Sequence, residues 1–542
     1  MNQTNIRHYN GSILAFSIVG VMAMYFIFAP AINLLYYNGD AFRYVYGGFG
    51  QSCKSDDGFE FMLTLGRPLQ AYLDCFVYKF AYTLERMKTI RLISIILMGC
   101  ATGLFAEWLY RLGLTVWSAF FAAGCLFLLP HLYEDTVLVG ALSLPIALIF
   151  AQLGYRCLYL LNISNSKKQM LAASLLMLAL LTYPAMAFFF VTLILTKFLF
   201  SNFSDWMRLR NELFQEMLLF CMVCAVYFVL AYLNMRFHSL APVPIQYQLN
   251  HPNLNIHEMA NRLGYLMNVF GRQWEVMRLH PGNTQGWMMI ALIASGILIR
   301  LNYRVFFQYL SRLPSLTNLA KSGQIVLTLF MLMVLSSGFF LTIPSAESPI
   351  MLRFLFAPLA AGFMLILWCM RQWDSILPTY MQKRLISGII ISFFLIESYE
   401  AGVHTFVSAL AVEQYMHVVV QKVNNYLTRG NKLQRVHFIL AEQEYPYTKF
   451  FMTRAILNML GQENSEIKWC SLPRGFNGKE EDYQSAALTC IREKSNNVIA
   501  VTYSYAHTLF SKTNNTLIID MKNITSDKFR KQNLQKYFDL TG

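Results

Sequence analysis

"ILAFSIVGVMAMYFIFAPAINLLY", residues 13–36, contains no charged side chain. A helix needs roughly 20 apolar residues to cross the hydrocarbon core of a bilayer, so this run can span a membrane. A short apolar stretch with a small-residue cleavage site would indicate a signal peptide instead. We therefore interpret residues 13–36 as a retained first span.

Similar apolar runs recur along the chain. It has 542 residues, of which 56% are hydrophobic and 14% are charged, whereas soluble domains carry about 25% charged residues. This composition predicts an α-helical polytopic membrane protein with about 11 spans. We place them at 13–36, 91–110, 115–130, 137–161, 169–183, 185–200, 216–236, 286–303, 324–343, 354–370 and 386–406.

Two of these spans, 169–183 and 185–200, are short and meet at Tyr183-Pro184. One long helix would also fit the apolar run. Because proline interrupts helices, and because one span needs only about 20 residues, we expect a hairpin here.

The charge distribution predicts an orientation. With the N-terminus inside, the short inner loops carry most of the basic residues, whereas the outer turns 131–136 and 344–349 contain no Lys or Arg. Such asymmetry is typical of the positive-inside rule. The net charge of +14 therefore indicates membrane lipids as partners and not nucleic acid. Two long loops, 37–90 and 237–285, are expected outside.

The composition changes near residue 407. Spans stop there, and short strand-like segments such as 435–441 and 466–471 alternate with helical ones. This pattern predicts a transmembrane domain over 1–406 and a small extracytoplasmic α/β domain over 407–542. Neither a GxGxxG nor a Walker A motif is present, so nothing indicates a nucleotide.

Four cysteines lie outside the spans. Cys53 and Cys75 occur in the first outer loop, and Cys470 and Cys490 occur in the C-terminal segment. Disulfides form in oxidising compartments, so we predict Cys53–Cys75 and Cys470–Cys490 bridges. The alternative is two pairs of free thiols. Their spacing does not match a zinc site.

Charged residues follow the first span directly. Asp40 stands three residues before Arg43, so one helical turn would place both on the same face. Residues 58–84 then have apolar residues at helical spacing, which predicts an amphipathic helix lying on the outer surface. Gly66-Arg67-Pro68 interrupts this helix and directs Arg67. The alternative is a solvated loop with a snorkelling arginine.

Other polar groups are expected at the same membrane edge. His131, Glu134 and Asp135 could bind a metal or transfer protons, but we favour a helix cap in which Asp135 or Thr136 begins the next span. Arg353 could hold a lipid phosphate or snorkel to head groups. Glu397, Glu400 and His404 share one helical face and could line a polar cavity, although an interhelical hydrogen bond is the simpler interpretation.

These features converge on one chemistry. Arginines at the outer edge could hold a lipid phosphate while a sugar packs against aromatic side chains. A carboxylate could then accept a proton from an incoming hydroxyl, which is general-base catalysis with an anionic leaving group.

The stretch "NGDAFRYVYGGFG…GFEFMLTLGRPL" (38–69) resembles the first outer loop of the bacterial O-antigen glucosyltransferase family, the Gtr type II group. Those proteins show Asp-Asp, a nearby Arg and Gly, and an aromatic-rich run that ends in Gly-Arg. Here the acidic pair becomes Gly39-Asp40, while Arg43 and Gly66-Arg67 match. "PHLYEDT" and "LLTYPAMAFFF" are similar to a short acidic turn and a Tyr-containing hairpin of the family. The resemblance covers about 13–410.

The resemblance implies a GT-C-like membrane glycosyltransferase in the bacterial inner membrane, with its active site on the periplasmic face. It would transfer a sugar, commonly glucose, from a polyprenyl-phosphate donor to a lipid-linked glycan or lipopolysaccharide acceptor such as O-antigen. Asp40 would be the base, Arg43 would orient it, and Arg67 and Arg353 would hold the donor phosphate. Asp56 and Asp57 are candidates to replace the lost acidic residue, and Mg²⁺ or Mn²⁺ is a candidate cofactor.

Two alternatives belong to other classes. A transporter or flippase of lipid-linked sugars predicts ionisable groups deep in the bundle and an inverted repeat, whereas the candidate charges here are expected at one edge and no repeat is visible. An O-antigen polymerase or ligase would depend on a late loop, here Arg262, Arg272 and His280. Alanine scanning of both loops would separate this alternative from the glycosyltransferase.

Overall fold

The computed structural model describes most of the chain. The described residues are 10–37, 41, 45, 57–81, 83–160, 164–201, 206–237, 356–374, 379–430, 432–440, 453–454, 456–457, 459–462, 464–471, 508–510, 516–520, 529, 532–533 and 535. They are mostly helical, as expected of a helical membrane protein. The predicted spans 286–303 and 324–343 lie outside these residues.

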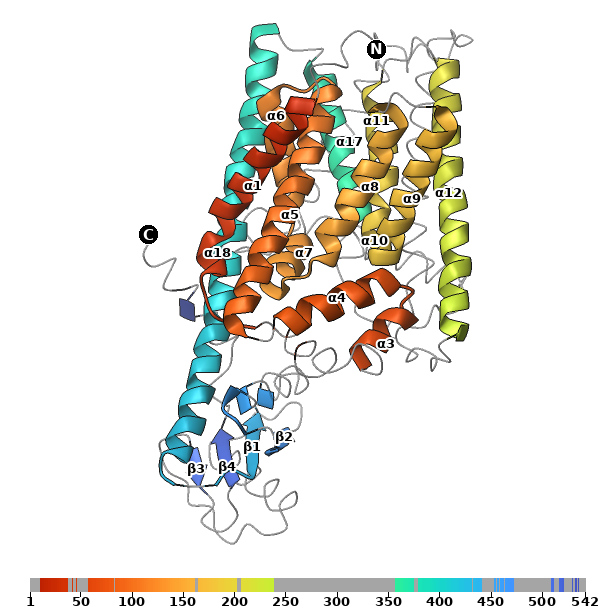
Figure 1. Ribbon diagram of the computed structural model, residues 1–542. Coiled ribbons are helices and arrows are strands. Elements are labelled where there is room, and N and C mark those ends of the chain that lie inside the picture. The colour runs from red at the N-terminus through yellow and green to blue at the C-terminus, as the bar shows by residue number, and fades with distance from the viewer. Residues whose placement is uncertain are drawn as a thin grey trace, which may run out of the picture.

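A bundle of helices forms the main body (Figure 1). Its members are α1 (Asn10–Ile32), α5 (Leu84–Arg111), α6 (Val116–Phe127), α8 (Ser143–Leu160), α9 (Asn165–Thr182), α11 (Phe189–Phe200), α12 (Trp206–Phe237), α17 (Phe356–Asp374) and α18 (Thr379–Leu427). In the described part of the chain, α1, α5, α12 and α18 contain segments long and apolar enough to cross a membrane. The helices α6 and α8 are shorter than the predicted spans 115–130 and 137–161, because residues 130–139 form separate turns.

Glycines allow α1 and α5 to pack closely. Gly99 and Gly103 are four residues apart on one face of α5, a spacing typical of close helix pairs in membranes. A Cβ atom on Gly99 would lie 2.4 Å from the Cα of Val21, and one on Gly103 would lie 2.5 Å from the Cα of Ser17. The two backbones are therefore in direct contact.

Gly99→Ala is expected to destabilise the fold. The added methyl group meets backbone atoms that cannot rotate away, and overpacking of this kind costs about 1–3 kcal/mol. Gly388→Ala in α18 is the matched control, because nothing lies within 4 Å of a Cβ there. Thermal unfolding of the purified protein in detergent measures both; equal melting temperatures would contradict the close α1–α5 contact.

The chain turns back at Tyr183, as the expected hairpin requires. The helix α9 ends at Thr182, Tyr183 is extended with φ −154° and ψ 95°, and Pro184 begins the short α10 (Pro184–Ala187). Figure 1 shows α9 descending to this point and α11 running back up beside α8. Proline has no backbone N–H, so it suits the first position of a new helix.

The first long loop crosses one end of the bundle. It contains α3 (Asp57–Thr64) and α4 (Pro68–Phe80), separated at Gly66-Arg67 as predicted. In Figure 1, α4 runs across the direction of the bundle helices, and we call this end of the bundle the α4 end. An amphipathic helix in this orientation can bury one face on the bundle and expose the other.

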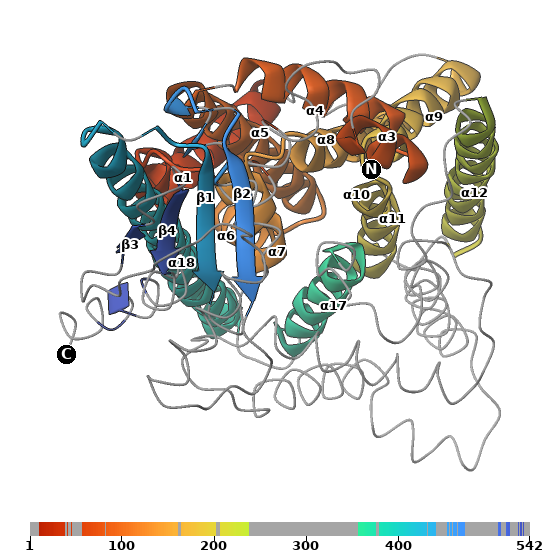
Figure 2. The same cartoon turned by 90° about the horizontal axis from the view of Figure 1, so that it is seen from below.

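The C-terminal segment forms a mixed sheet beyond the same end. The described strands β1 (Arg435–Leu440), β2 (Glu466–Ser471), β3 (Thr508–Phe510) and β4 (Thr516–Asp520) have the order β2-β1-β4-β3. Strand β1 pairs in parallel with β2 and β4, and β3 is antiparallel. Strands β1 and β2 lie where the sequence predicted them. Figure 2, viewed from this end, shows the sheet and α3–α4 over different parts of the bundle.

A single helix joins the bundle to the sheet. The helix α18 extends to Leu427, so the predicted span 386–406 is only its first part and the proposed domain boundary at residue 407 falls inside it. One buried apolar cluster contains residues of the first loop, of α18 and of the sheet, including Tyr36, Val419, Val436 and Leu517. The α4 end and the sheet therefore share a core.

Candidate functional site

The structure describes only part of the predicted site. Asp40, Arg43, Asp56, Arg353, Cys53 and Cys490 lie outside the described residues. Asp57 begins α3, His131 lies in α7 (Pro130–Tyr133) and Cys470 lies in β2, but their side chains are not among those described. Arg67, Cys75, Glu134 and Asp135 are described.

Four hydrogen bonds hold the chain that leads to Asp40. Arg91 of α5 is fully buried, and its guanidinium donates to the carbonyl oxygens of Leu34 at 3.3 Å and Tyr36 at 2.6 Å. The backbone N–H of Leu35 donates to Oε1 of Glu413 in α18 at 2.8 Å. Tyr37 donates through its hydroxyl to the carbonyl of Ala81 at 3.0 Å. Residues 34–37 therefore have a fixed path up to three positions before Asp40.

The break between α3 and α4 depends on Gly66. This residue has φ +73°, in the left-handed region that favours glycine. Its carbonyl accepts a hydrogen bond from the hydroxyl of Tyr227 in α12 at 2.9 Å, and a Cβ would lie 2.8 Å from that same oxygen. Tyr227 thus fixes the turn that presents Arg67.

Arg67 points into the protein rather than into solvent. It is 7% exposed, and its guanidinium carbon lies 4.2 Å from the centre of the Tyr183 ring. Its Nη1 donates to Oε1 of Gln70 at 3.4 Å. The hairpin tyrosine therefore forms one wall around Arg67, through a cation–π contact that is stronger when shielded from water.

A buried carboxyl group lies one step further along α4. Gln70 donates through Nε2 to Oδ2 of Asp74 at 3.0 Å, and Asp74 is 4% exposed. Burial raises the pKa of Asp74 to about 7, although the Gln70 hydrogen bond and the Arg67 charge both oppose this rise. Arg67, Gln70 and Asp74 thus form a polar line on the buried face of α4.

The sequence matches no protein-family model and no curated protein.

Cys75 lies on the same buried face and is disulfide-bonded. Its partner is not among the cysteines whose side chains are described, so the predicted pairing with Cys53 stays a prediction. The same holds for Cys470–Cys490. A covalent bond at Cys75 ties α4 to another part of the chain and restricts the movement of the helix that carries Asp74.

Neither Asp135 nor Thr136 caps the following span, contrary to expectation. Both lie in a π-helical turn, Glu134–Val139, which ends at Gly140 with φ +74°, and α8 begins only at Ser143. The carbonyl of Asp135 accepts the backbone N–H of Gly140 and of Ala141. The wider turn requires a left-handed residue to end it, and glycine adopts that conformation without strain.

This turn brings together two polar groups that are distant in the sequence. Nδ1 of His404 in α18 lies 3.9 Å from Oε1 of Glu134 and 3.4 Å from the hydroxyl of Tyr133. The three side chains give the α4 end an acid–base group separate from Arg67. Among the described residues, no three His, Cys, Asp or Glu side chains gather as metal ligands would. Of the predicted metal ligands, Asp56, Asp57 and His131 are not among the side chains that the structure describes, so the Mg²⁺ or Mn²⁺ prediction stays a prediction.

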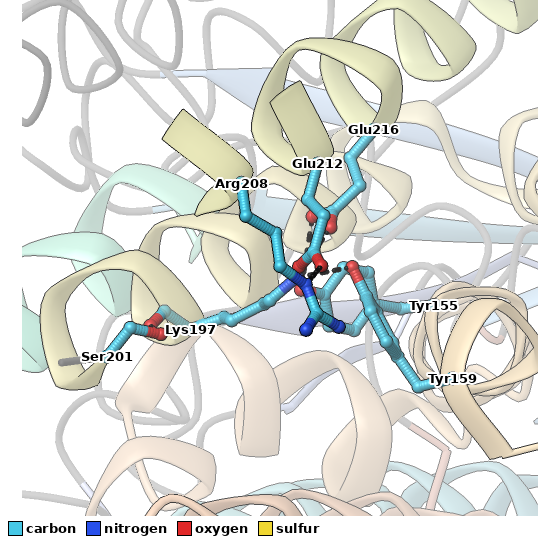
Figure 3. Close-up of polar contacts among 7 residues, drawn as sticks. All are labelled: Tyr155, Tyr159, Lys197, Ser201, Arg208, Glu212 and Glu216. Carbon is cyan, nitrogen blue, oxygen red and sulfur yellow. Dashed lines mark hydrogen bonds and ion pairs between the residues drawn. The ribbon is translucent and has the colours of Figure 1, made fainter. Parts of the chain in front are cut away.

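A second polar network lies near the opposite end and was missed in the sequence (Figure 3). Nζ of Lys197 donates to Tyr159, Glu212 and Glu216, each at 2.8 Å. Tyr155 donates to Glu216 at 3.3 Å, and Arg208 pairs with Glu212 at 2.9 Å. An ammonium group has three donors, and here all three are used. One indication of this network is visible in the sequence, namely a lysine inside the apolar run 185–200.

A neighbouring ion pair is even more buried. Glu107 of α5 is inaccessible to solvent and pairs with Arg111 of its own helix and with Arg156 of α8. Trp108, which follows Glu107, has its ring 5.2 Å from that of Tyr155, a member of the Lys197 network, so the two sets of buried charges are neighbours. The candidate functional charges were expected at one membrane edge, and the structure shows that the other end also holds buried charges.

Proposed function

We propose that this protein is a GT-C-like membrane glycosyltransferase that moves a sugar, commonly glucose, from a polyprenyl-phosphate donor to a glycan such as O-antigen or lipopolysaccharide. Asp40 removes the proton from the acceptor hydroxyl, with Arg43 beside it. Arg67 and Arg353 stabilise the phosphate that leaves. The bond between the anomeric carbon and the phosphate oxygen breaks as the bond to the acceptor oxygen forms.

The observation that carries this proposal is the buried Arg67 at the start of α4. A helix that crosses the end of the bundle positions a guanidinium between the hairpin Tyr183 and the polar residues of α4. Guanidinium groups bind phosphate oxygens through a planar set of donors. The residues that precede Asp40 approach the same end.

We place the α4 end and the sheet on the periplasmic face of the bacterial inner membrane. The opposite end carries Lys167, Lys168, Arg208, Arg210 and Arg371, and basic residues favour the cytoplasmic side. A polyprenyl-phosphate sugar presented on the outer leaflet could then reach Arg67.

The buried charges of the opposite end do not favour a transporter. Transporters bind their substrates near the middle of the bilayer. Glu107, Arg156 and Lys197 lie within about one helical turn, roughly 5 Å, of the ends of their helices. Lys197 also has no donor left for a substrate. The Lys197 network instead connects α8, α11 and α12 to one another.

Donor turnover tests the proposal directly. Purified protein in vesicles should release polyprenyl phosphate from polyprenyl-phosphate glucose when an acceptor glycan is added. Arg67→Ala should raise the KM for the donor roughly 10- to 100-fold, because hydrogen bonds to charged groups contribute about 1.5–3 kcal/mol. Arg236→Ala is the matched control, an arginine of α12 whose guanidinium contacts only Tyr232 of its own helix among the described residues.

An unchanged donor KM in Arg67→Ala would remove Arg67 from the site. The polymerase or ligase alternative makes a different prediction, namely that alanine at Arg262, Arg272 or His280 abolishes activity while Asp40→Ala does not. Those three residues lie outside the described part of the chain.

A further inference from the structure

We infer that Asp74 is a specificity-determining residue that weakens the preference of the Arg67 site for the more highly charged product over the singly charged donor, and so promotes release of the carrier lipid. This inference rests on the proposed function. Asp74 does not touch the substrate; it acts through its charge, across Gln70, on whatever anion Arg67 holds.

The geometry places Asp74 within electrostatic reach of Arg67. Gln70 bridges them, donating to Asp74 at 3.0 Å and accepting from Arg67 at 3.4 Å. A carboxylate only accepts and a guanidinium only donates, so both neighbours fix the orientation of the amide between them. The hydrogen bonds therefore run from Arg67 through Gln70 to Asp74, and the Gln70 amide stands between the guanidinium and the carboxylate.

Because Asp74 is buried, its negative charge can act on an anion held by Arg67. Asp74 is 4% and Arg67 is 7% exposed, so little water screens their interactions. Arg67 is the only described charge that acts on Asp74, and α3, α5, α8 and α9, which pack against α4, contribute none. An anion held by Arg67 would lie on the order of 10 Å from Asp74 and would interact unfavourably with its carboxylate.

The donor and the product differ in charge. A polyprenyl-phosphate sugar is a phosphodiester with one negative charge. Sugar transfer leaves polyprenyl phosphate, which is a phosphomonoester. Like other phosphomonoesters, it carries about 1.5 to 2 negative charges near pH 7. The repulsion from Asp74 therefore grows when the sugar leaves, while the attraction of Arg67 grows too. Asp74 offsets part of that added attraction and prevents tight retention of the product.

Protonation of Asp74 removes this effect. The pKa of Asp74 is about 7, so the carboxyl group is neutral at pH 6 and charged at pH 8.5. An anion at Arg67 stabilises the neutral form. Donor affinity should therefore rise as the pH falls through this range, whereas the donor phosphodiester itself does not titrate there.

The experiment measures binding of two probes, undecaprenyl phosphate glucose and undecaprenyl phosphate, to the full-length protein in nanodiscs. At pH 8.5 Asp74→Asn should tighten donor binding roughly tenfold and product binding more than that. It should also abolish the pH dependence of donor binding between pH 6 and 8.5. Glu60→Gln, an exposed carboxylate of α3, is the matched control and should change neither affinity.

Each outcome has one meaning. If Asp74→Asn weakens either ligand, leaves both affinities within twofold or tightens product binding no more than donor binding, the inference is wrong. If the wild-type protein binds neither lipid, the proposed function fails, and the inference fails with it. If Asp74→Asn unfolds, the pH series on the wild-type protein decides, because protonation removes the same charge without a substitution. A donor affinity that does not change with pH would then overturn the inference.

Discussion

Asp40→Asn is expected to lower sugar transfer by roughly 100- to 10,000-fold, the range that a general base contributes. Asparagine has the size of aspartate but cannot accept the acceptor's proton. Donor binding should stay close to that of the wild-type protein, because the arginines proposed to hold the phosphate are unchanged. The measurement is single-turnover transfer of labelled glucose from the polyprenyl-phosphate donor, together with the donor dissociation constant.

Asp56→Asn and Asp57→Asn are the comparison variants in the same loop. If either abolishes transfer while Asp40→Asn turns over normally, the base is not Asp40. A loss of donor binding in Asp40→Asn would instead show that the residue holds the substrate. The melting temperature of each variant separates these cases from misfolding.

Lys197→Met should strongly destabilise the bundle, by about 3–5 kcal/mol. Methionine keeps most of the length of the side chain but removes the charge. Glu216, which is 5% exposed, and Glu212 then lose the ammonium group that compensates their carboxylates. Thermal unfolding in detergent, followed by tryptophan fluorescence, measures the loss.

Two variants test the cause. Arg208→Met removes a cation whose side chain is 78% exposed and which pairs with Glu212, so it should cost about 1 kcal/mol or less. The double variant Lys197→Met/Glu216→Gln should recover part of the stability, because it no longer buries an uncompensated carboxylate. A loss in Arg208→Met equal to that in Lys197→Met would show that burial of the pair is unimportant.

Local chemistry made part of this fold predictable. Gly66-Arg67-Pro68 predicted the break between α3 and α4, because proline begins a helix and glycine accepts a left-handed turn. The alternating pattern of 435–440 predicted β1. Tyr183-Pro184 predicted the hairpin for a similar reason. In each case a few neighbouring residues determine the conformation.

The side-chain environment of the site could not be predicted in this way. The spacing of Arg67, Gln70 and Asp74 is visible in the sequence, but their burial depends on Tyr183 and Tyr227, which come more than 100 residues later. His404 meets Glu134 only because α18 passes the π-helical turn. Lys197, Glu212 and Glu216 lie on two helices, so their pairing depends on how α11 packs against α12.

The continuous helix α18 has a mechanical consequence. At about 1.5 Å per residue, its 49 residues form a rod about 74 Å long, and its sequence contains no proline at which it would bend easily. Glu413 attaches this rod to the backbone at Leu35, while its far end carries the sheet. We therefore expect a tilt of the sheet to displace the backbone at Leu35 and, with it, the residues that lead into Asp40.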